Sequence, residues 1–152
     1  DNSLNNGLEM FLTTHGGLNS GYMIAQYTSA SIVSENKILA NPSSTDSIPT
    51  SANQEDHVSM GSISARHLYK ICSNVAQILA IELITAAQAV DLRTDQPQKD
   101  LGKGTYLIYD KIREHVDYLD EDRVLYPEIL KMKEVIESGE LLQAVNQKIN
   151  MD

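Results

Sequence analysis

The sequence predicts an all-α fold, a bundle of long helices, and three observations support this prediction. Apolar residues recur at three- and four-residue steps over two long stretches, residues 18–39 and 54–93. No stretch carries a convincing strand pattern, and no internal repeat is found. With 152 residues, the chain fits one domain of common size.

The first helical stretch, residues 18–39, is nearly free of charge before Glu35 and is rich in small residues. Small side chains let neighbouring helices approach closely and can also line a site; we favour packing, with most of this helix shielded from water. Residues 41–53 follow as a loop with two prolines and six Ser or Thr residues. A loop of this length is often functional, and a linker is the alternative.

The second helical stretch is too long for a globule of this size. Thirty-odd residues at 1.5 Å each form a rod of roughly 55–60 Å, whereas a globule of 152 residues has a diameter of about 40 Å. The apolar surface of the rod must therefore be covered by other chains or by a part of the protein outside this chain. Cys72, within this stretch, is expected to be a small core residue.

Charge divides the chain into two portions. Residues 1–90 hold 10 charged side chains and residues 91–152 hold 23, so the first portion has the composition of an interior and the second that of a surface. We expect residues 1–93 to form long central helices with a site loop at residues 41–54. Residues 94–152 are expected to form a C-terminal region of short helices.

The C-terminal region begins with a polar link over residues 94–104. Pro127 suits the first turn of a helix, and the acidic residues 120–122 form a turn without the spacing of a calcium-binding loop. Apolar periodicity predicts three short helices, at residues 105–116, 128–137 and 140–149.

Composition excludes several classes of partner. The net charge of −9 and the pI near 4.8 argue against nucleic acid and anionic membrane surfaces. The most apolar stretch, residues 75–90, is interrupted by polar residues and predicts a buried helix, not a membrane span. A single cysteine favours a reducing, cytoplasmic location. The chain starts without a methionine, which suggests processing, trimming or a piece of a longer protein.

Several kinds of chemistry lack their residues. The four histidines are scattered, and no His-Glu-x-x-His or Cys-x-x-Cys spacing occurs, so no metal site is predicted. There is also no Gly-x-Ser-x-Gly nucleophile elbow and no glycine loop that could hold a phosphate.

Residues 51–61, Ser-Ala-Asn-Gln-Glu-Asp-His-Val-Ser-Met-Gly, admit two interpretations. In one, Asn53 caps the long helix, and Glu55 and Asp56 lie in its first turn, where the helix dipole favours negative charge. In the other, Glu55 leaves the helix end to meet a ligand. His57 could orient that carboxylate or bind the ligand, but a hydrogen-bonded structural histidine is favoured. Spacing does not decide between these interpretations.

Several motifs in one order resemble the histidine ammonia-lyases of the aromatic amino acid lyase family, over about residues 7–145. The resemblance is to the C-terminal portion of such an enzyme. The motifs are Gly-Gly-Leu-Asn-Ser-Gly-Tyr-Met-Ile-Ala-Gln at 16–26, Ser-Glu-Asn-Lys at 34–37, Ser-Ile-Pro-Thr-Ser-Ala-Asn-Gln-Glu-Asp-His-Val-Ser-Met-Gly at 47–61, Ala-Ala-Gln-Ala-Val-Asp-Leu-Arg at 86–93 and Leu-Asp-Glu-Asp-Arg-Val-Leu-Tyr-Pro at 119–127.

The resemblance implies a mainly helical, fumarase/aspartase-like fold whose long central helices bundle across a cytoplasmic homotetramer. It implies a carbon–nitrogen lyase of histidine catabolism, which converts L-histidine to urocanate and ammonia at sites assembled from several subunits. The electrophile of the family is methylidene-imidazolone, formed from an internal Ala-Ser-Gly. This chain contains no Ala-Ser-Gly, so the N-terminal catalytic portion is absent from it.

The resemblance also assigns site residues. Glu55 matches the catalytic glutamate that lies beside the substrate side chain, where a carboxylate can accept a hydrogen bond from the imidazole and help its protons move. Phenylalanine and tyrosine lyases carry glutamine there, so Glu55 followed by Asp56 and His57 points to histidine as the substrate. Asn53, Gln54 and His57 are further candidates for substrate binding.

Two other functions remain open. One is a helical assembly module, descended from a lyase, that performs no chemistry. The other is a lyase or aminomutase that acts on another aromatic amino acid.

We predict that these 152 residues alone have no lyase activity, because they lack the Ala-Ser-Gly from which the electrophile forms. The measurement is urocanate formation from histidine by a preparation that intact-mass analysis shows to contain only this chain. Detectable turnover by such a preparation would contradict the prediction.

Overall fold

The computed structural model describes residues 4–148, which contain six α-helices and no β-strand. Three single 3₁₀ turns, at Met10–Leu12, Ser43–Thr45 and Ser51–Asn53, lie in the loops. The predicted all-α fold is confirmed. The helices are α1 (Met23–Leu39), α2 (Gly61–Asp91), α3 (Pro97–Asp100), α4 (Lys103–Arg113), α5 (Tyr126–Glu137) and α6 (Glu140–Lys148).

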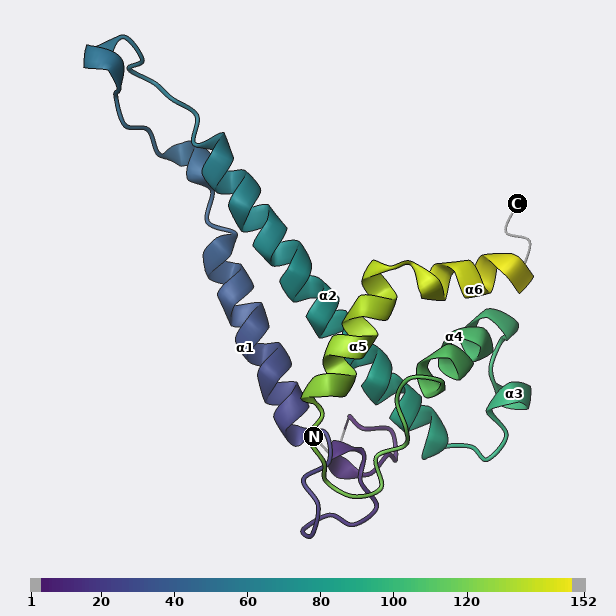
Figure 1. The fold of residues 1–152 in the computed structure, drawn as a ribbon. Helices are drawn as coiled ribbons and strands as arrows, with labels where there is room; N and C mark the ends of the chain where they lie inside the picture. Colours follow the sequence, from purple (N-terminus) through teal and green to yellow (C-terminus); the bar gives the residue numbers. More distant parts are fainter. Residues whose placement is uncertain (1–3, 149–152) are drawn as a thin grey trace.

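The helices α1 and α2 lie side by side and form an arm that projects from the rest of the molecule (Figure 1). The helices α3 to α6 gather around the C-terminal half of α2 and form a lobe (Figure 1). The loop between α1 and α2 lies at the free end of the arm, far from this lobe.

Both long helices begin later than predicted. Residue 18 was the expected start of the first helix, but α1 begins at Met23. Gly21 has φ +53°, and a Cβ there would overlap the carbonyl oxygen of Phe11, which accepts a 2.9 Å hydrogen bond from the Tyr22 N–H. This close approach requires glycine and delays the helix. The second helix begins at Gly61 instead of about residue 54.

The short helices follow their sequence signals. Pro127 lies in the first turn of α5, which ends before Gly139 at φ +76°. The helix α4 covers most of predicted residues 105–116, and α6 ends at Lys148, with the last predicted residue outside the described range. The predicted polar link contains the additional short helix α3.

The core lies where α2 meets α5 and α4. Four buried residues of α2 face it, and partners come from the start of α1, the α4–α5 connection and α5 itself. The cluster consists of Tyr22, Ala25, Ala80, Ile81, Ile84, Ala87, Ile112, Val116, Leu119, Ile129, Met132 and Val135.

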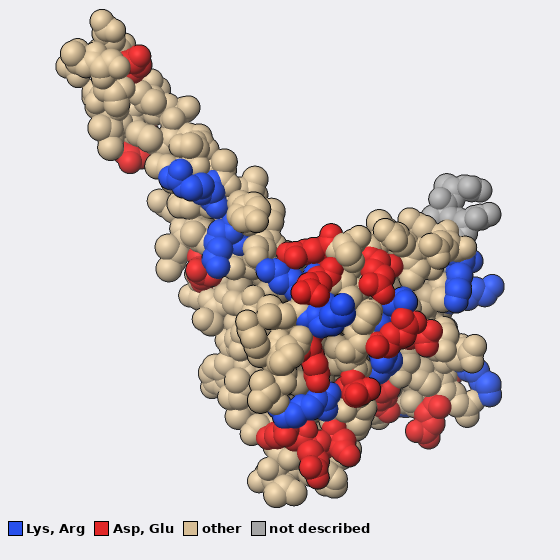
Figure 2. Space-filling model, in the orientation of Figure 1, with Lys and Arg blue, Asp and Glu red and all other residues tan. Residues whose placement is uncertain are grey.

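The arm leaves apolar side chains in solvent. Leu68 and Tyr69 on α2 are 61% and 81% exposed, and Ala25 is the one buried residue on α1. Cys72 is exposed, so its predicted burial in the core is wrong for this chain. Figure 2 shows few charges on the arm and many on the lobe. The 31 residues of α2 span about 46 Å, which is shorter than the predicted 55–60 Å, but α2 still projects beyond the lobe (Figure 1).

By length and hydropathy alone, α2 could cross a membrane. Core helices of soluble proteins share these properties, so one such helix is weak evidence for a span.

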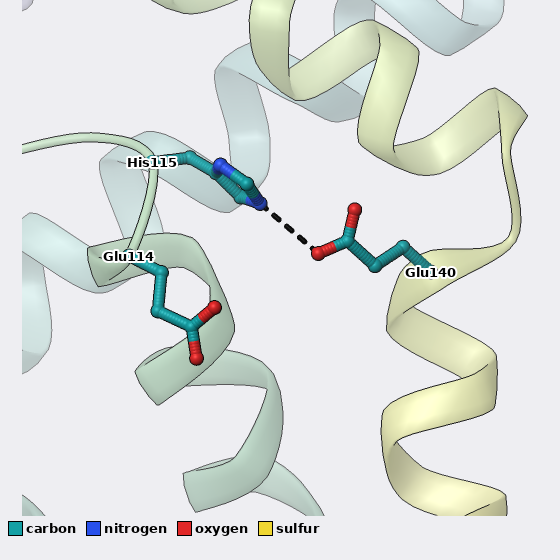
Figure 3. Close-up of side chains that lie close together, drawn as sticks. All are labelled: Glu114, His115 and Glu140. Carbon is teal, nitrogen blue, oxygen red and sulfur yellow. Dashed lines mark hydrogen bonds and ion pairs between the residues drawn. The ribbon is translucent and has the colours of Figure 1, made fainter.

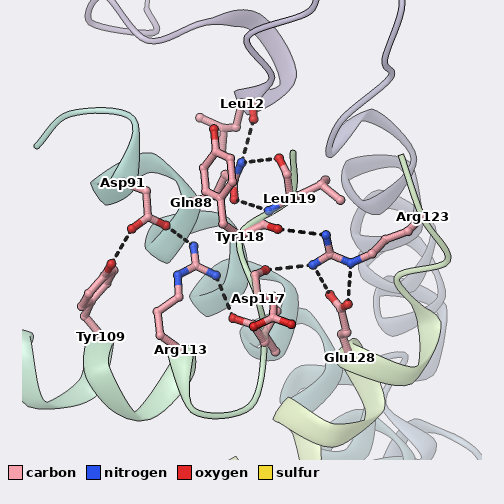
Figure 4. A network of polar contacts seen from close by, with 11 residues as sticks. Leu12, Gln88, Asp91, Tyr109, Arg113, Asp117, Tyr118, Leu119, Arg123 and Glu128 are labelled. Atoms are coloured by element: carbon pink, nitrogen blue, oxygen red, sulfur yellow. Dashed lines mark hydrogen bonds and ion pairs between the residues drawn. The ribbon is translucent and has the colours of Figure 1, made fainter. Parts of the chain in front are cut away.

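The buried amide of Gln88 joins three segments of the chain (Figure 4). Its Nε2 donates to the carbonyl oxygens of Leu119, at 2.8 Å, and of Leu12, at 3.2 Å. Its Oε1 accepts from the Leu119 N–H at 3.0 Å. One side chain of α2 therefore fixes both the N-terminal loop and the connection between α4 and α5.

Charged side chains fix the rest of that connection (Figure 4). Asp91 accepts hydrogen bonds from Arg113 and from the Tyr109 hydroxyl. Arg123 donates to the carbonyl oxygens of residues 117 and 118 and pairs with Glu128 at 2.7 Å. The connection is thereby tied to α2 at one end and to α5 at the other.

We expect Gln88→Ala to lower the free energy of unfolding by about 2–4 kcal/mol, because it leaves buried backbone groups of Leu119 without partners. The measurement is urea unfolding of the intact protein, followed by circular dichroism. The matched control is Gln77→Ala in the same helix, whose half-buried side chain makes no hydrogen bond among the described residues. Equal shifts for both variants would contradict the prediction.

Tyr22 is buried, and within the described residues its hydroxyl has no hydrogen-bond partner. We therefore expect Tyr22→Phe to leave stability unchanged or to raise it by up to about 1 kcal/mol. Burial raises the pKa of Tyr22 from 10.0 to about 12. The folded state thus favours the neutral phenol, and this contribution to stability is complete below pH 10 and is lost as the pH rises towards 12.

The measurement for Tyr22 is the free energy of unfolding from pH 8 to pH 12. Wild type should lose more stability above pH 10 than Tyr22→Phe does. A large loss of stability on Tyr22→Phe at pH 8 would instead reveal a hydrogen-bond partner outside the described residues.

Candidate functional site

The predicted site residues lie on the loop at the free end of the arm (Figure 1). Three consecutive residues there, Ser51, Ala52 and Asn53, have left-handed backbones with φ of 52°, 55° and 68°. For residues with a Cβ, each such conformation costs about 1–2 kcal/mol. Strain of this kind persists only where surrounding contacts impose it, and it clusters at functional sites.

Asn53 is not the cap of the long helix. It ends the 3₁₀ turn Ser51–Asn53, and α2 begins only at Gly61, with no side-chain cap on its first turn. Backbone hydrogen bonds explain the difference. Thr50 and Glu55 form an isolated bridge, with N–H to O distances of 3.0 and 3.4 Å, so the chain closes on itself before the helix starts. Glu55 and Asp56 therefore do not lie in the first turn of α2, as one interpretation had expected.

A second hydrogen bond closes the loop outside the Thr50–Glu55 bridge. The Val58 N–H donates to the Ser47 Oγ at 2.9 Å. The Thr50–Glu55 bridge therefore lies inside a second, wider closure between Ser47 and Val58. The sequence showed Ser47 only as part of a motif, and no local pattern indicated its partner.

The four predicted site side chains, those of Asn53, Gln54, Glu55 and His57, are all exposed on this one loop. Among the described residues, none of them makes a side-chain hydrogen bond, so His57 has no such structural partner here. The carboxylate of Glu55 is free to accept hydrogen bonds from a ligand that carries N–H donors. The loop offers a group for proton transfer but no enclosing wall of its own.

Sequence reasoning missed a second cluster, formed by Glu114, His115 and Glu140 (Figure 3). Their candidate ligand atoms all lie within 4.8 Å of one another, and His115 Nε2 is 3.1 Å from Glu140 Oε1. No sequence spacing indicated it, because Glu140 comes from another helix.

The ammonium group of Lys111 already lies in this second cluster. Lys111 Nζ lies 2.5 Å from Glu114 and 3.5 Å from Glu140. The hydrogen bond from His115, with smaller contributions from Lys111, lowers the pKa of Glu140. We interpret the cluster as the ionic contact that docks α6 on α4, since Lys111 supplies the charge that a metal ion would bring.

Comparisons with known proteins cover most of the chain. A profile of the aromatic amino acid lyase family matches residues 1–114. The histidine ammonia-lyase of Alkaliphilus oremlandii is 52% identical over 145 residues, which are 95% of this chain and 28% of that protein.

Solved structures of the same group superpose closely. The histidine ammonia-lyase of Trypanosoma cruzi aligns with a TM-score of 0.85 at 42% identity, over 92% of this chain and 27% of that one. The tyrosine aminomutase of Streptomyces globisporus aligns with a TM-score of 0.90 at 35% identity, over 96% and 27%. The chain thus spans little more than a quarter of the length of these relatives.

Proposed function

The chain belongs to the aromatic amino acid lyase family, and we propose that it is the C-terminal portion of a histidine ammonia-lyase. The complete protein would deaminate L-histidine to urocanate and ammonia. One observation carries the proposal: the 52% identity to a histidine ammonia-lyase extends over 145 of the 152 residues. An alignment of that extent includes the loop that carries Glu55.

The proposed role of this chain is to supply Glu55. The exposed carboxylate accepts a hydrogen bond from the imidazole of the substrate and takes up or returns a proton as the reaction proceeds. His57, two residues further along the loop, is close enough in sequence to orient that carboxylate. Asn53 and Gln54 shape the turn from which Glu55 projects.

The electrophile belongs to another part of the protein. Methylidene-imidazolone supplies the electron-poor centre that makes the amino group a leaving group, and it forms from Ala-Ser-Gly. The sequence of this chain has no Ala-Ser-Gly, so its residues neither form nor carry the group. Their proposed part is to bind the side chain of the substrate and to handle its protons.

The same proposal includes a cytoplasmic homotetramer. Exposed apolar residues along the arm, such as Leu68 and Tyr69, support an assembly in which other subunits or the rest of the protein cover α1 and α2. Because the Glu55 loop lies at the end of that arm, it would enter a site built with neighbouring subunits. The acidic charge of the chain supports a small-molecule substrate over nucleic acid or a membrane surface.

Sequence identity supports histidine over other aromatic substrates. The identity is 42% to the structurally known histidine ammonia-lyase and 35% to the tyrosine aminomutase. Glutamate at residue 55 agrees with this order, because a carboxylate pairs with an imidazole N–H. A non-catalytic assembly module would require that the complete protein lack Ala-Ser-Gly.

We expect Glu55→Gln in the complete protein to lower kcat/KM for L-histidine by about 100-fold, because an amide cannot accept a proton. The measurement is urocanate formation, with tyrosine and phenylalanine assayed in parallel. Glu121→Gln, at an exposed position of the lobe, is the matched control and should retain full activity. Unchanged histidine turnover by Glu55→Gln would refute the role of Glu55, and selectivity for tyrosine or phenylalanine would refute the substrate.

A further inference from the structure

The loop that carries Glu55 depends on one side-chain hydrogen bond at its base. The Ser47 hydroxyl accepts the Val58 N–H at 2.9 Å, and both residues are half-buried. In the part of the chain that is described, this is the one side-chain hydrogen bond that joins the two sides of the loop. Thr45 also uses its hydroxyl, but its acceptor is Pro42, three residues away.

Between Ser47 and Val58, the backbone has a conformation that it would not adopt without restraint. Residues 51–53 are left-handed although each carries a Cβ, and the Thr50–Glu55 bridge closes over them. A free chain would relax these three residues towards ordinary backbone angles, which would turn Glu55 in a new direction. The conformation therefore needs an external restraint on both sides of the bridge.

Ser47 provides that restraint. Ser47 precedes Thr50 by three residues, and its partner Val58 follows Glu55 by three. Their hydrogen bond therefore holds together the two chain segments that lead into and out of the Thr50–Glu55 bridge. Removing the hydroxyl leaves the Val58 N–H without its acceptor and frees both of these chain segments. The carboxylate of Glu55 stays present in that case, but its position is no longer defined.

We propose that Ser47 is a positioning residue for Glu55, acting through the hydrogen bond to Val58 to fix the direction from which the carboxylate meets the substrate. This inference rests on the proposed function, in which Glu55 contacts the imidazole of L-histidine. Ser47 itself does not contact the reacting atoms in this account. Its effect on turnover passes entirely through Glu55.

A double-mutant cycle in the complete protein tests this dependence. The four proteins are wild type, S47A, E55Q and S47A/E55Q, with kcat and KM measured for L-histidine. We expect S47A alone to lower kcat by about threefold to tenfold, which corresponds to the net free energy of one hydrogen bond. In the E55Q background, the same S47A change should lower kcat by less than about twofold, because no carboxylate remains to be positioned.

Three further variants separate positioning from folding. S47T keeps the hydroxyl and should restore kcat to within about twofold of wild type. S44A removes from the same loop an exposed hydroxyl that makes no hydrogen bond within residues 4–148, and it should leave kcat unchanged. If S47A fails to fold, S47C replaces it in the cycle, because a thiol of similar size is a weaker acceptor and leaves the chain intact.

Each outcome decides the proposal. Equal losses on S47A in both backgrounds would show a general effect on structure and overturn it, as would unchanged turnover by S47A where E55Q is impaired. If E55Q itself retained full activity on histidine, the role of Glu55 would fail, and the positioning role of Ser47 with it. Impairment by E55Q together with indifference to S47A would leave the proposed function standing and reject only Ser47.

Discussion

The buried amide of Gln88 is the contact on which the rest of the fold depends. Two segments distant from α2 in sequence, the N-terminal loop at Leu12 and the α4–α5 connection at Leu119, meet at this one side chain and pair their backbone groups with it. An amide suits this position because it both donates and accepts, and so pairs with the N–H and the C=O of Leu119 at once. A buried apolar residue of the same size would leave those groups unpaired. The lobe is therefore held together by hydrogen bonds of buried polar groups as well as by its buried apolar residues.

The consequence is a molecule with two unlike halves. The lobe has its own core, its ion pairs and most of the charge (Figure 2). The arm has a long helix pair whose outward residues are apolar and exposed, and it ends in a loop with unusual backbone angles. The family to which the chain belongs accounts for this contrast, since the chain spans only about a quarter of the length of its relatives. The arm leaves apolar residues exposed, which supports the proposed assembly with other subunits or with the rest of the protein.

Much of the fold could be predicted from local patterns. Pro127 and Gly139 marked the two ends of α5, and apolar periodicity revealed both long helices. The start of α2 could not be predicted, because Asn53 followed by acidic residues has the pattern of a helix cap. The bridge from Thr50 to Glu55 wins over that local preference, and a bridge between residues five apart leaves no trace in periodicity.

The candidate site shows the same limit. Family motifs gave Glu55 and its neighbours, and the structure places them together on one exposed loop. The Ser47–Val58 contact and the Glu114–His115–Glu140 cluster required the fold, because each joins residues that lie apart in the sequence. The burial expected for Cys72 failed for another reason: it lies on the arm, where apolar residues of α2 such as Leu68 and Tyr69 are exposed as well.

The uninterrupted course of α2 makes the arm a lever. One helix of 31 residues runs from the Glu55 loop into the core of the lobe, over about 46 Å. A tilt of about 2° at the lobe would move the far end by about 1.6 Å over that length, and a misplacement of about 1 Å can slow an enzyme by about 100-fold. The neighbouring subunits that we propose to cover the apolar sides of the arm would therefore do more than exclude water. They would act as a brace that holds the tip steady to a fraction of an ångström.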